Sequence, residues 1–125
     1  MRATKADILE VVEDGKSYGR YMEWGDMDID WLSYPGGRDS TMAFKGLPGD
    51  GCPVPHWGYM IKGRMRMKYP DHEEVINAGE AFYMAPGHNG VTEEDCELVT
   101  FSPKGENKKV MAVVLRNREA MKKKG

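Results

Sequence analysis

The sequence predicts an all-β fold, and two observations support this prediction. Short segments in which apolar and polar residues alternate recur along the 125-residue chain, and turns rich in glycine and proline separate them. Together these segments indicate about eight short strands and little helix. A chain of this kind must protect the unpaired edges of its sheets, and closure into a barrel or a two-sheet jelly roll achieves this.

The N-terminal third shows both patterns. Residues 8–12 form an apolar cluster that fits either a short helix or a first edge strand, and the turn sequence at 13–16 follows it. From Tyr18 onward the pattern has period two, and three aspartates alternate with three apolar residues between positions 26 and 31. This alternation predicts a strand with one buried apolar face and one face toward solvent, the face of Asp26, Asp28 and Asp30.

The remaining segments complete the β pattern. A turn at 34–39 and a Gly/Pro-rich loop at 46–55 flank a short strand at 40–44. Further strands are expected at 57–61, 64–69, 74–77, 81–84, 97–101 and 110–115, with a hairpin tip at 70–73 and a turn at 85–90. The last segment, 116–125, is a polar, basic tail, and a frayed helix is the alternative there.

Length and composition indicate one domain, residues 1–125, and exclude several classes of protein. The formal net charge of −2 gives no field that would attract nucleic acid or an anionic membrane. No apolar run approaches the roughly 20 residues that span a bilayer, and the N-terminal residues lack the apolar region of a secretory signal. Cys52 and Cys96 are therefore expected to be reduced thiols of a cytoplasmic protein.

Residues 56–87 resemble a known family. The segment 56–63 reads His-Trp-Gly-Tyr-Met-Ile-Lys-Gly, and the segment 77–87 reads Asn-Ala-Gly-Glu-Ala-Phe-Tyr-Met-Ala-Pro-Gly. These segments are similar to the two motifs of the cupin superfamily, in particular to those of small single-domain bacterial cupins of the conserved-barrel type. The resemblance implies a jelly-roll β-barrel (a double-stranded β-helix), a site inside it and a homodimer. The matched region is 46–115, with N-terminal strands at 1–45 before it.

The chain departs from the cupin pattern at the metal ligands. That pattern supplies His-x-His and Glu from the first motif and a further His from the second. Here His56 stands where the Glu is expected, while Asp50 and Cys52 stand near the two histidine positions. In the second motif, Gly90 falls near the histidine position, and His88 is the available imidazole. The resemblance therefore implies a looser group of four: Asp50, Cys52, His56 and His88.

Two interpretations of this group stay open. Thiolate and imidazole donors suit zinc, iron, nickel or copper, so one hypothesis is a divalent transition metal bound by Cys52, His56 and His88. The other hypothesis has no metal, and makes His56 an interior histidine, Cys52 a small buried thiol and His88 a turn residue. His56 is also the candidate catalytic acid or base, because its ordinary pKa of about 6.5 lies near neutral pH.

The expected barrel interior has room for a small-molecule ligand. Flexible methionine side chains near His56 leave space for an apolar or planar molecule, although the same methionines could instead fill the barrel. The residues expected to bind the molecule are Met60, Met65, Met67, Tyr69 and Met84.

The sequence thus favours a small-molecule-binding cupin, and the resemblance implies a metal-assisted oxygenase, isomerase or lyase if the protein is an enzyme. The alternatives are a non-catalytic ligand-binding or sensor domain, and a cupin with a degenerate site that keeps a structural, dimer-forming role.

Overall fold

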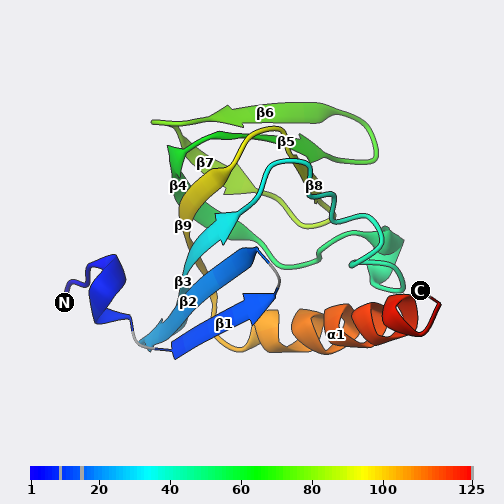
Figure 1. Cartoon of the computed structure of the whole chain (residues 1–125). Coiled ribbons are helices and arrows are strands. Elements are labelled where there is room, and N and C mark those ends of the chain that lie inside the picture. The colour runs from blue at the N-terminus through cyan, green and yellow to red at the C-terminus, as the bar shows by residue number, and fades with distance from the viewer. Residues whose placement is uncertain (9, 15, 125) are drawn as a thin grey trace.

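The computed structural model describes residues 1–8, 10–14 and 16–124, and places nine strands of these residues in two antiparallel sheets (Figure 1). The strands are β1 (Glu10–Asp14), β2 (Ser17–Trp24), β3 (Met27–Tyr34), β4 (His56–Lys62), β5 (Arg64–Lys68), β6 (Glu73–Asn77), β7 (Ala81–Met84), β8 (Asn89–Thr92) and β9 (Cys96–Pro103). The helical segments are the 3-10 turns η1 (Lys5–Asp7) and η2 (Pro48–Asp50) and the helix α1 (Glu106–Lys124). The predicted all-β class and two-sheet arrangement are confirmed, with one C-terminal helix added.

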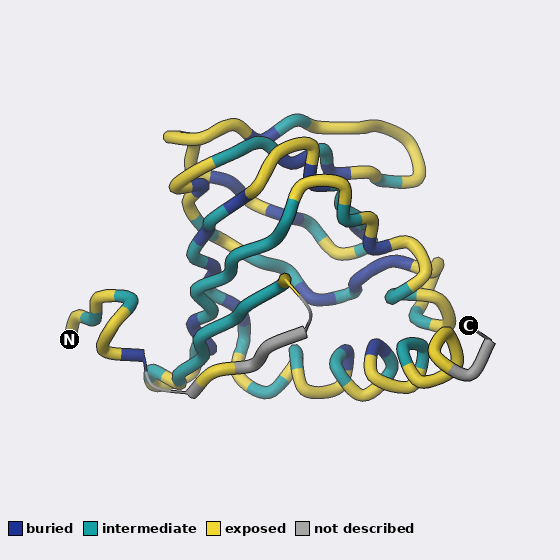
Figure 2. Tube along the Cα trace, in the orientation of Figure 1, coloured by how far each residue is buried: buried dark blue, intermediate teal, exposed yellow. Residues whose placement is uncertain are grey.

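Strand β9 organises the larger sheet. Its six strands follow the order β1-β2-β3-β9-β4-β7, so β9 pairs with β3 on one side and with β4 on the other. Buried and partly buried residues alternate along β9, which presents one face to the interior (Figure 2). The smaller sheet has the order β6-β5-β8. Its strands pair around β5, so residues far apart in the sequence line one interior.

The main core lies between the two sheets and is rich in methionine. Its buried members are Met60, Met65, Met67, Ile76, Phe82, Met84, Cys96 and Leu98. Methionine is unbranched and flexible, so these side chains fill the irregular space between two twisted sheets. Gly58 on β4 belongs to the same packing, because a Cβ there would lie 2.6 Å from the ring of Phe82.

The predicted strand at 110–115 is wrong, because these residues are the middle of α1. Val110 and Val114 stand four residues apart and are both buried, which is the spacing of one helix face. They pack against Cys52 and Val54 in the loop before β4. A short apolar run fits a strand and a buried helix face equally well, and here the contact with that loop decides. The expected tail is the second half of the same helix, and Gly125 lies outside the described residues.

Two local expectations also change, and one open choice is resolved. Residues 40–44 form turns rather than a strand, because the Asp39 carboxylate accepts hydrogen bonds from the backbone N–H and the hydroxyl of Thr41. The turn expected at 85–90 gives way at Asn89 to strand β8. For the open choice at 8–12, Glu10 and the residues after it form the edge strand β1, and Leu9 lies outside the described residues. The turn expected at 13–16 includes Gly15, which lies outside the described residues.

The two faces of β3 do not divide as predicted. Asp28 is fully buried, and Ile29 on the opposite face is 3% exposed, so both faces are covered. Asp28 and Asp30 point to the interior, whereas Asp26, in the turn before β3, is exposed as predicted. Asp28 accepts hydrogen bonds from the Tyr21 hydroxyl (3.0 Å) and from the Gly105 backbone N–H (3.0 Å). Alternation shows that a strand has two different faces, but it does not show which face turns inward.

No helix among the described residues has both the length and the apolar character that crossing a membrane requires.

Leu98 provides a test of the core. It is 1% exposed on β9, whereas Leu115 on α1 is 52% exposed. We expect Leu98→Ala to lower the free energy of unfolding by about 2–5 kcal/mol, because it leaves a void that the sheets cannot close. Leu115→Ala should change it by less than about 0.5 kcal/mol. Urea unfolding of the two variants measures both values, and equal effects would contradict the described packing.

Candidate functional site

A backbone bridge holds Cys52 and His88 side by side, although 36 positions separate them in the sequence. The Cys52 N–H donates to the His88 carbonyl at 2.8 Å, and the Gly87 N–H donates to the Cys52 carbonyl at 2.7 Å. The two segments approach closely at Gly51, where a Cβ would lie 2.8 Å from the Gly87 carbonyl oxygen. Glycine at position 51 therefore permits the bridge that sets the distance between thiol and imidazole.

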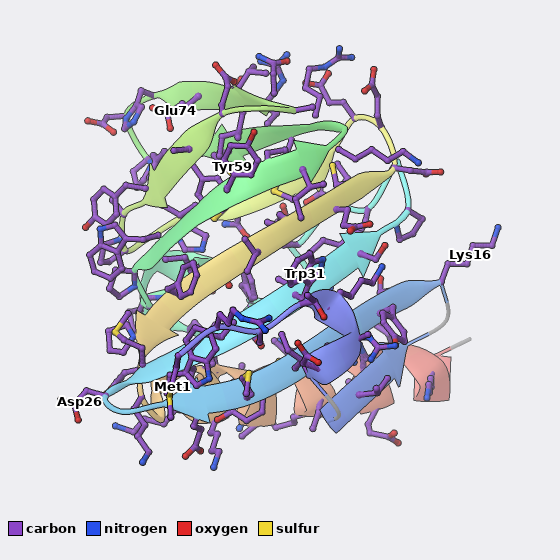
Figure 3. The ribbon with its side chains drawn as sticks, turned by 90° about the vertical axis from the view of Figure 1, so that its left-hand side faces the viewer. Met1, Lys16, Asp26, Trp31, Tyr59 and Glu74 are labelled. Atoms are coloured by element: carbon purple, nitrogen blue, oxygen red, sulfur yellow. The ribbon has the colours of Figure 1, made fainter. Side chains whose placement is uncertain are left out.

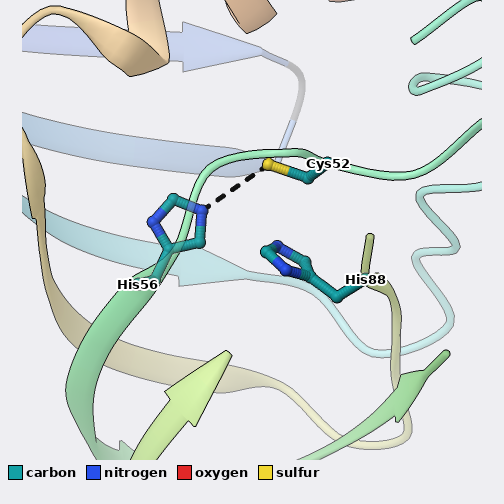
Figure 4. A group of neighbouring side chains, drawn as sticks. All are labelled: Cys52, His56 and His88. Atoms are coloured by element: carbon teal, nitrogen blue, oxygen red, sulfur yellow. Dashed lines mark hydrogen bonds between the residues drawn. The ribbon is translucent and has the colours of Figure 1, made fainter. Parts of the chain in front are cut away.

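His56 joins this pair from the first position of β4. Its Nε2 lies 3.7 Å from the Cys52 Sγ, and its ring centroid lies 5.1 Å from that of His88 (Figure 4). Its other ring nitrogen, Nδ1, is 2.5 Å from the hydroxyl oxygen of Ser102, which is fully buried on β9. This hydrogen bond orients the ring so that Nε2 faces the thiol.

The three side chains form a group with metal-ligand chemistry. Each of Cys52, His56 and His88 offers one ligand atom, and these atoms all lie within 4.8 Å of one another. The Nδ1 of His88 donates to the Ala85 carbonyl at 2.8 Å, which leaves the lone pair of Nε2 free. A histidine ligand in a metal site is oriented in the same way, by a hydrogen bond from the nitrogen that does not bind.

Burial keeps all three groups neutral at neutral pH. It lowers the pKa of His56 to about 3, with a smaller contribution from the neighbouring His88, and it lowers the pKa of His88. It also raises the pKa of the Cys52 thiol, against the opposing effect of its contact with the Val54 carbonyl. Neutral imidazoles present lone pairs, while the thiol would lose its proton on binding a metal.

A cavity of about 250 Å³ adjoins the group formed by Cys52, His56 and His88. Strands of both sheets, the 38–52 loop and α1 all contribute to its wall. Its apolar lining residues include Leu32, Phe44, Met65, Met67, Met84, Leu98 and Met111. Its polar lining residues include Tyr21, Asp30, Thr100 and Asn107. A small organic molecule in this cavity could therefore contact the three potential metal ligands together with both apolar and polar lining residues.

The structure brings most of the expected binding residues to this cavity. Met65, Met67 and Met84 line it. Met60 and Tyr69 are not among the described lining residues: Met60 is completely buried in the core, and Tyr69 packs against the outside of that core. The Tyr69 hydroxyl accepts a hydrogen bond from the Ala85 N–H, so it supports the segment before His88.

Asp50 does not join the group that the resemblance implied. It is exposed at the end of η2, and its carboxylate accepts a hydrogen bond from the Gly46 N–H at 2.9 Å within its own loop. The other histidine, His72, is exposed at the hairpin tip, where it stacks on Tyr69 at 4.5 Å. The group therefore has three members rather than four.

Sequence reasoning missed the polar part of the wall. The missed residues of the wall are Tyr21, Asp30, Thr100 and Asn107, and Ser102, which holds the His56 ring from behind, was missed as well. For Asp30 the signal was present as the alternating aspartates, but it was assigned to solvent. The others carry no pattern of their own, because only the pairing of β3 with β9 and the position of α1 bring them together.

Several solved structures share this arrangement of strands. An RmlC-like cupin from Shewanella frigidimarina superposes with a TM-score of 0.61 over 84% of this chain and 92% of its own, at 16% identity. The chain has a cupin fold. KdgF from a Halomonas species superposes with a TM-score of 0.57 over 79% of this chain and 92% of its own, at 15% identity. No protein-family model matches the sequence, and no curated protein matches it.

A larger protein contains the same cupin fold as a part. The oxalate decarboxylase of Bacillus subtilis, in the form of a single-residue variant, superposes with a TM-score of 0.56 over 77% of this chain but only 27% of its own, at 14% identity. The fold predicted from residues 56–63 and 77–87 is thus confirmed by structures with little sequence in common. Such a likeness establishes the cupin fold and leaves the reaction to be argued from the site itself.

Asp30 gives this cavity a measurable pH dependence. Burial, and then the nearby charge of Asp28, raise the pKa of Asp30 from 3.8 to about 6. The folded state therefore holds this proton more tightly than the unfolded state does, and the stability that it contributes is lost as the pH rises from about 4 to about 6. Asp30→Asn removes this loss.

We expect Asp30→Asn to be more stable than the wild type at pH 7.5, by about 1–3 kcal/mol, with the difference shrinking toward pH 4.5. Urea unfolding at both pH values measures it. The same substitution at the exposed Asp26 is the matched control and should have no such effect. A variant of Asp30 that is less stable at pH 7.5 would show that its hydrogen bond with Asn107 outweighs the burial of the charge.

Proposed function

We propose that this protein binds a divalent transition metal through Cys52, His56 and His88, and a small organic ligand in the adjoining cavity. The observation that carries the proposal is the convergence of one thiol and two oriented imidazoles at the wall of that cavity. The cupin fold is consistent with a site inside the sheets.

The separation of the donor atoms supports a common ion. Metal–ligand bonds of about 2.0–2.3 Å in tetrahedral geometry place neighbouring ligand atoms roughly 3.3–3.8 Å apart. The Cys52 Sγ and the His56 Nε2 are 3.7 Å apart, and the largest separation in the group, within 4.8 Å, closes with a small side-chain rotation. Thiol and imidazole donors fit zinc, iron, nickel or copper better than magnesium or calcium.

Three protein ligands favour a working site over a structural one. Structural zinc sites are closed by four protein ligands, whereas catalytic and ligand-binding sites keep a position open. A metal bound here would polarise a ligand oxygen or acidify a bound water. The chain's own residues would orient the molecule along the methionine-lined wall and exclude water from it.

The same geometry favours a ligand role for His56 over an acid–base role. With its pKa lowered to about 3, the imidazole is a weak proton acceptor at neutral pH but keeps its lone pair available. The reaction class implied by the cupin resemblance, a metal-assisted oxygenase, isomerase or lyase, stays a prediction. The structurally similar proteins carry different names, among them KdgF and an oxalate decarboxylase, so they favour none of the three.

As the second part of the proposal, we propose that the protein forms a homodimer, and an exposed aromatic face supports this. Trp57, Tyr59, Ile61 and Tyr83 lie on the outer face of β4 and β7 and are each 39–49% exposed. Trp57 and Tyr83 stack at 5.2 Å, and the side chain of Tyr59 projects outward from the same sheet (Figure 3). A second copy related by a two-fold axis would cover this face with the same face of its own.

Metal content tests the first part of the proposal. We expect purified tag-free protein to bind one Co²⁺ or Zn²⁺ per chain, and the Co²⁺ form to show a thiolate-to-cobalt absorption band. Cys52→Ser should abolish the band, and His56→Ala or His88→Ala should weaken metal affinity at least tenfold. Equilibrium dialysis and visible spectroscopy measure these effects.

Two residues of the chain supply controls for that experiment. Cys96→Ser changes the other buried free thiol, and His72→Ala changes the exposed histidine, so neither should alter the metal content or the band. Metal binding that is the same in all five variants would remove the metal from the proposal and favour the interpretation without a metal.

The oligomeric state tests the second part of the proposal. Sedimentation velocity at micromolar concentration should give twice the 14.1 kDa chain mass for the wild type and the chain mass for Tyr83→Arg. Leu115→Arg introduces the same charge at the 52%-exposed Leu115 of α1 and should stay dimeric. A monomeric wild type would contradict the dimer.

A further inference from the structure

The cavity has a second polar region, formed by one inward-facing row of residues on adjacent strands. Tyr21 on β2 pairs in register with Asp30 on β3, and Asp30 pairs with Thr100 on β9. Asn107 of α1 approaches the same row and donates from Nδ2 to the Asp30 Oδ2 at 3.2 Å. All four residues line the cavity.

The two inward aspartates of β3 differ in how many of their carboxylate oxygens accept a hydrogen bond. Asp28 is fully buried, and each of its oxygens accepts a hydrogen bond, one from Tyr21 and the other from Gly105. Asp30 has one such bond, to Asn107, and its Oδ1 has no hydrogen-bond partner among the described residues. Asp28 therefore stabilises the fold, while Asp30 keeps an acceptor available to the cavity.

Thr100 adds a second available group. It is 3% exposed, lines the cavity directly opposite Asp30 in register, and its hydroxyl has no hydrogen-bond partner among the described residues. A molecule in the cavity can therefore donate a hydrogen bond to this hydroxyl or accept one from it. Two adjacent incompletely bonded groups on one wall point to a polar occupant.

Along β9, this row lies two residues from the position that contacts the Cys52/His56/His88 group. Ser102, which holds the His56 ring, is two residues from Thr100, a distance of about 7 Å along a strand. A molecule of a few carbon atoms can therefore reach from the three potential metal ligands to Asp30 and Thr100.

We propose that Asp30 and Thr100 form a subsite that binds a hydroxyl or ammonium group of a small organic molecule, whose other end is an oxygen ligand at the Cys52/His56/His88 site. The inference rests on the proposed function for that other end. The Asp30 Oδ1 accepts a hydrogen bond from the donor group, and the Thr100 hydroxyl completes its bonding with the same group. Asn107 positions the carboxylate through Oδ2.

The electrostatics of Asp30 are consistent with this role. Its carboxylate is held in a partly desolvated place beside the charge of Asp28, which raises its pKa, and an incoming donor would offset that penalty. Groups held at a cost in stability are characteristic of binding sites.

The experiment compares three probes of similar size on zinc-loaded protein: 4-hydroxybutyrate, 4-aminobutyrate and butyrate. Each carries a carboxylate for the metal, and only the first two carry a donor for Asp30. We expect the wild type to bind the two donor probes at least about tenfold more tightly than butyrate by calorimetry. Asp30→Asn and Thr100→Val should reduce this preference, the former to within about twofold for 4-aminobutyrate, while the zinc content stays the same. Asp26→Asn should keep the full preference.

The outcomes separate this inference from the proposed function. Equal affinities of the three probes for zinc-loaded wild type would overturn the subsite and leave the metal site in place. If the protein binds no zinc, or none of the three probes, the proposed function fails and a metal-free measurement decides the subsite. The Asp30 carboxyl carbon resonance is then followed with 1-butanol and butylamine, and a shift supports the subsite while its absence overturns it.

Discussion

Two backbone hydrogen bonds between Cys52 and the segment at Gly87 and His88 determine the geometry of the site. They join the loop before β4 to the turn before β8, so a thiol and an imidazole from opposite ends of the cupin motif region become neighbours. His56 reaches the same point because β4 begins there and because Ser102 on β9 orients its ring. If the bridge were lost, the residues would remain in the chain but would no longer share one ligand position.

Helix α1 supports this bridge from outside the sheets. Val110 and Val114 pack against Cys52 and Val54, and the Asn117 side chain donates to the carbonyls of Ala43 and Lys45, at 2.8 Å in each case. The loop that carries the thiol thus has a hydrophobic and a hydrogen-bonded contact with the helix. The helix also lines the cavity. It therefore both stabilises the loop that carries Cys52 and limits the space available to a molecule in the cavity.

The interior combines flexible apolar side chains with a few polar ones. The hydrogen bonds of the polar side chains distinguish those that hold the fold together from those that a bound molecule could still contact. Asp28 and Ser102 are fully buried with hydrogen-bond partners, as buried polar groups normally are. Asp30 and Thr100 lie in the next row toward the cavity and are less completely bonded. The cupin fold thus provides a mainly apolar chamber with a few polar groups, and its donor set, one thiol and two imidazoles, differs from the histidine and glutamate pattern of the family resemblance. Softer donors shift the preference among transition metals, which the fold alone does not specify.

The sequence by itself determined the fold class, the strands from 57 to 84 and the identity of the three potential ligands, because turn residues and period-two alternation are local signals and the cupin-like motifs lie at 56–63 and 77–87. It could not determine that 110–115 is helical, since an apolar run has the same composition in a strand and in a buried helix face, and the contact with Cys52 and Val54 decides between them. Nor could it determine that Asp28 and Asp30 face inward. A period-two pattern separates the two faces of a strand, but only the position of the strand in the sheet decides which face is buried. The cavity, the exclusion of Asp50 and the row formed by Asp30 and Thr100 follow from strand pairing across many residues, and only the tertiary structure brings those positions together.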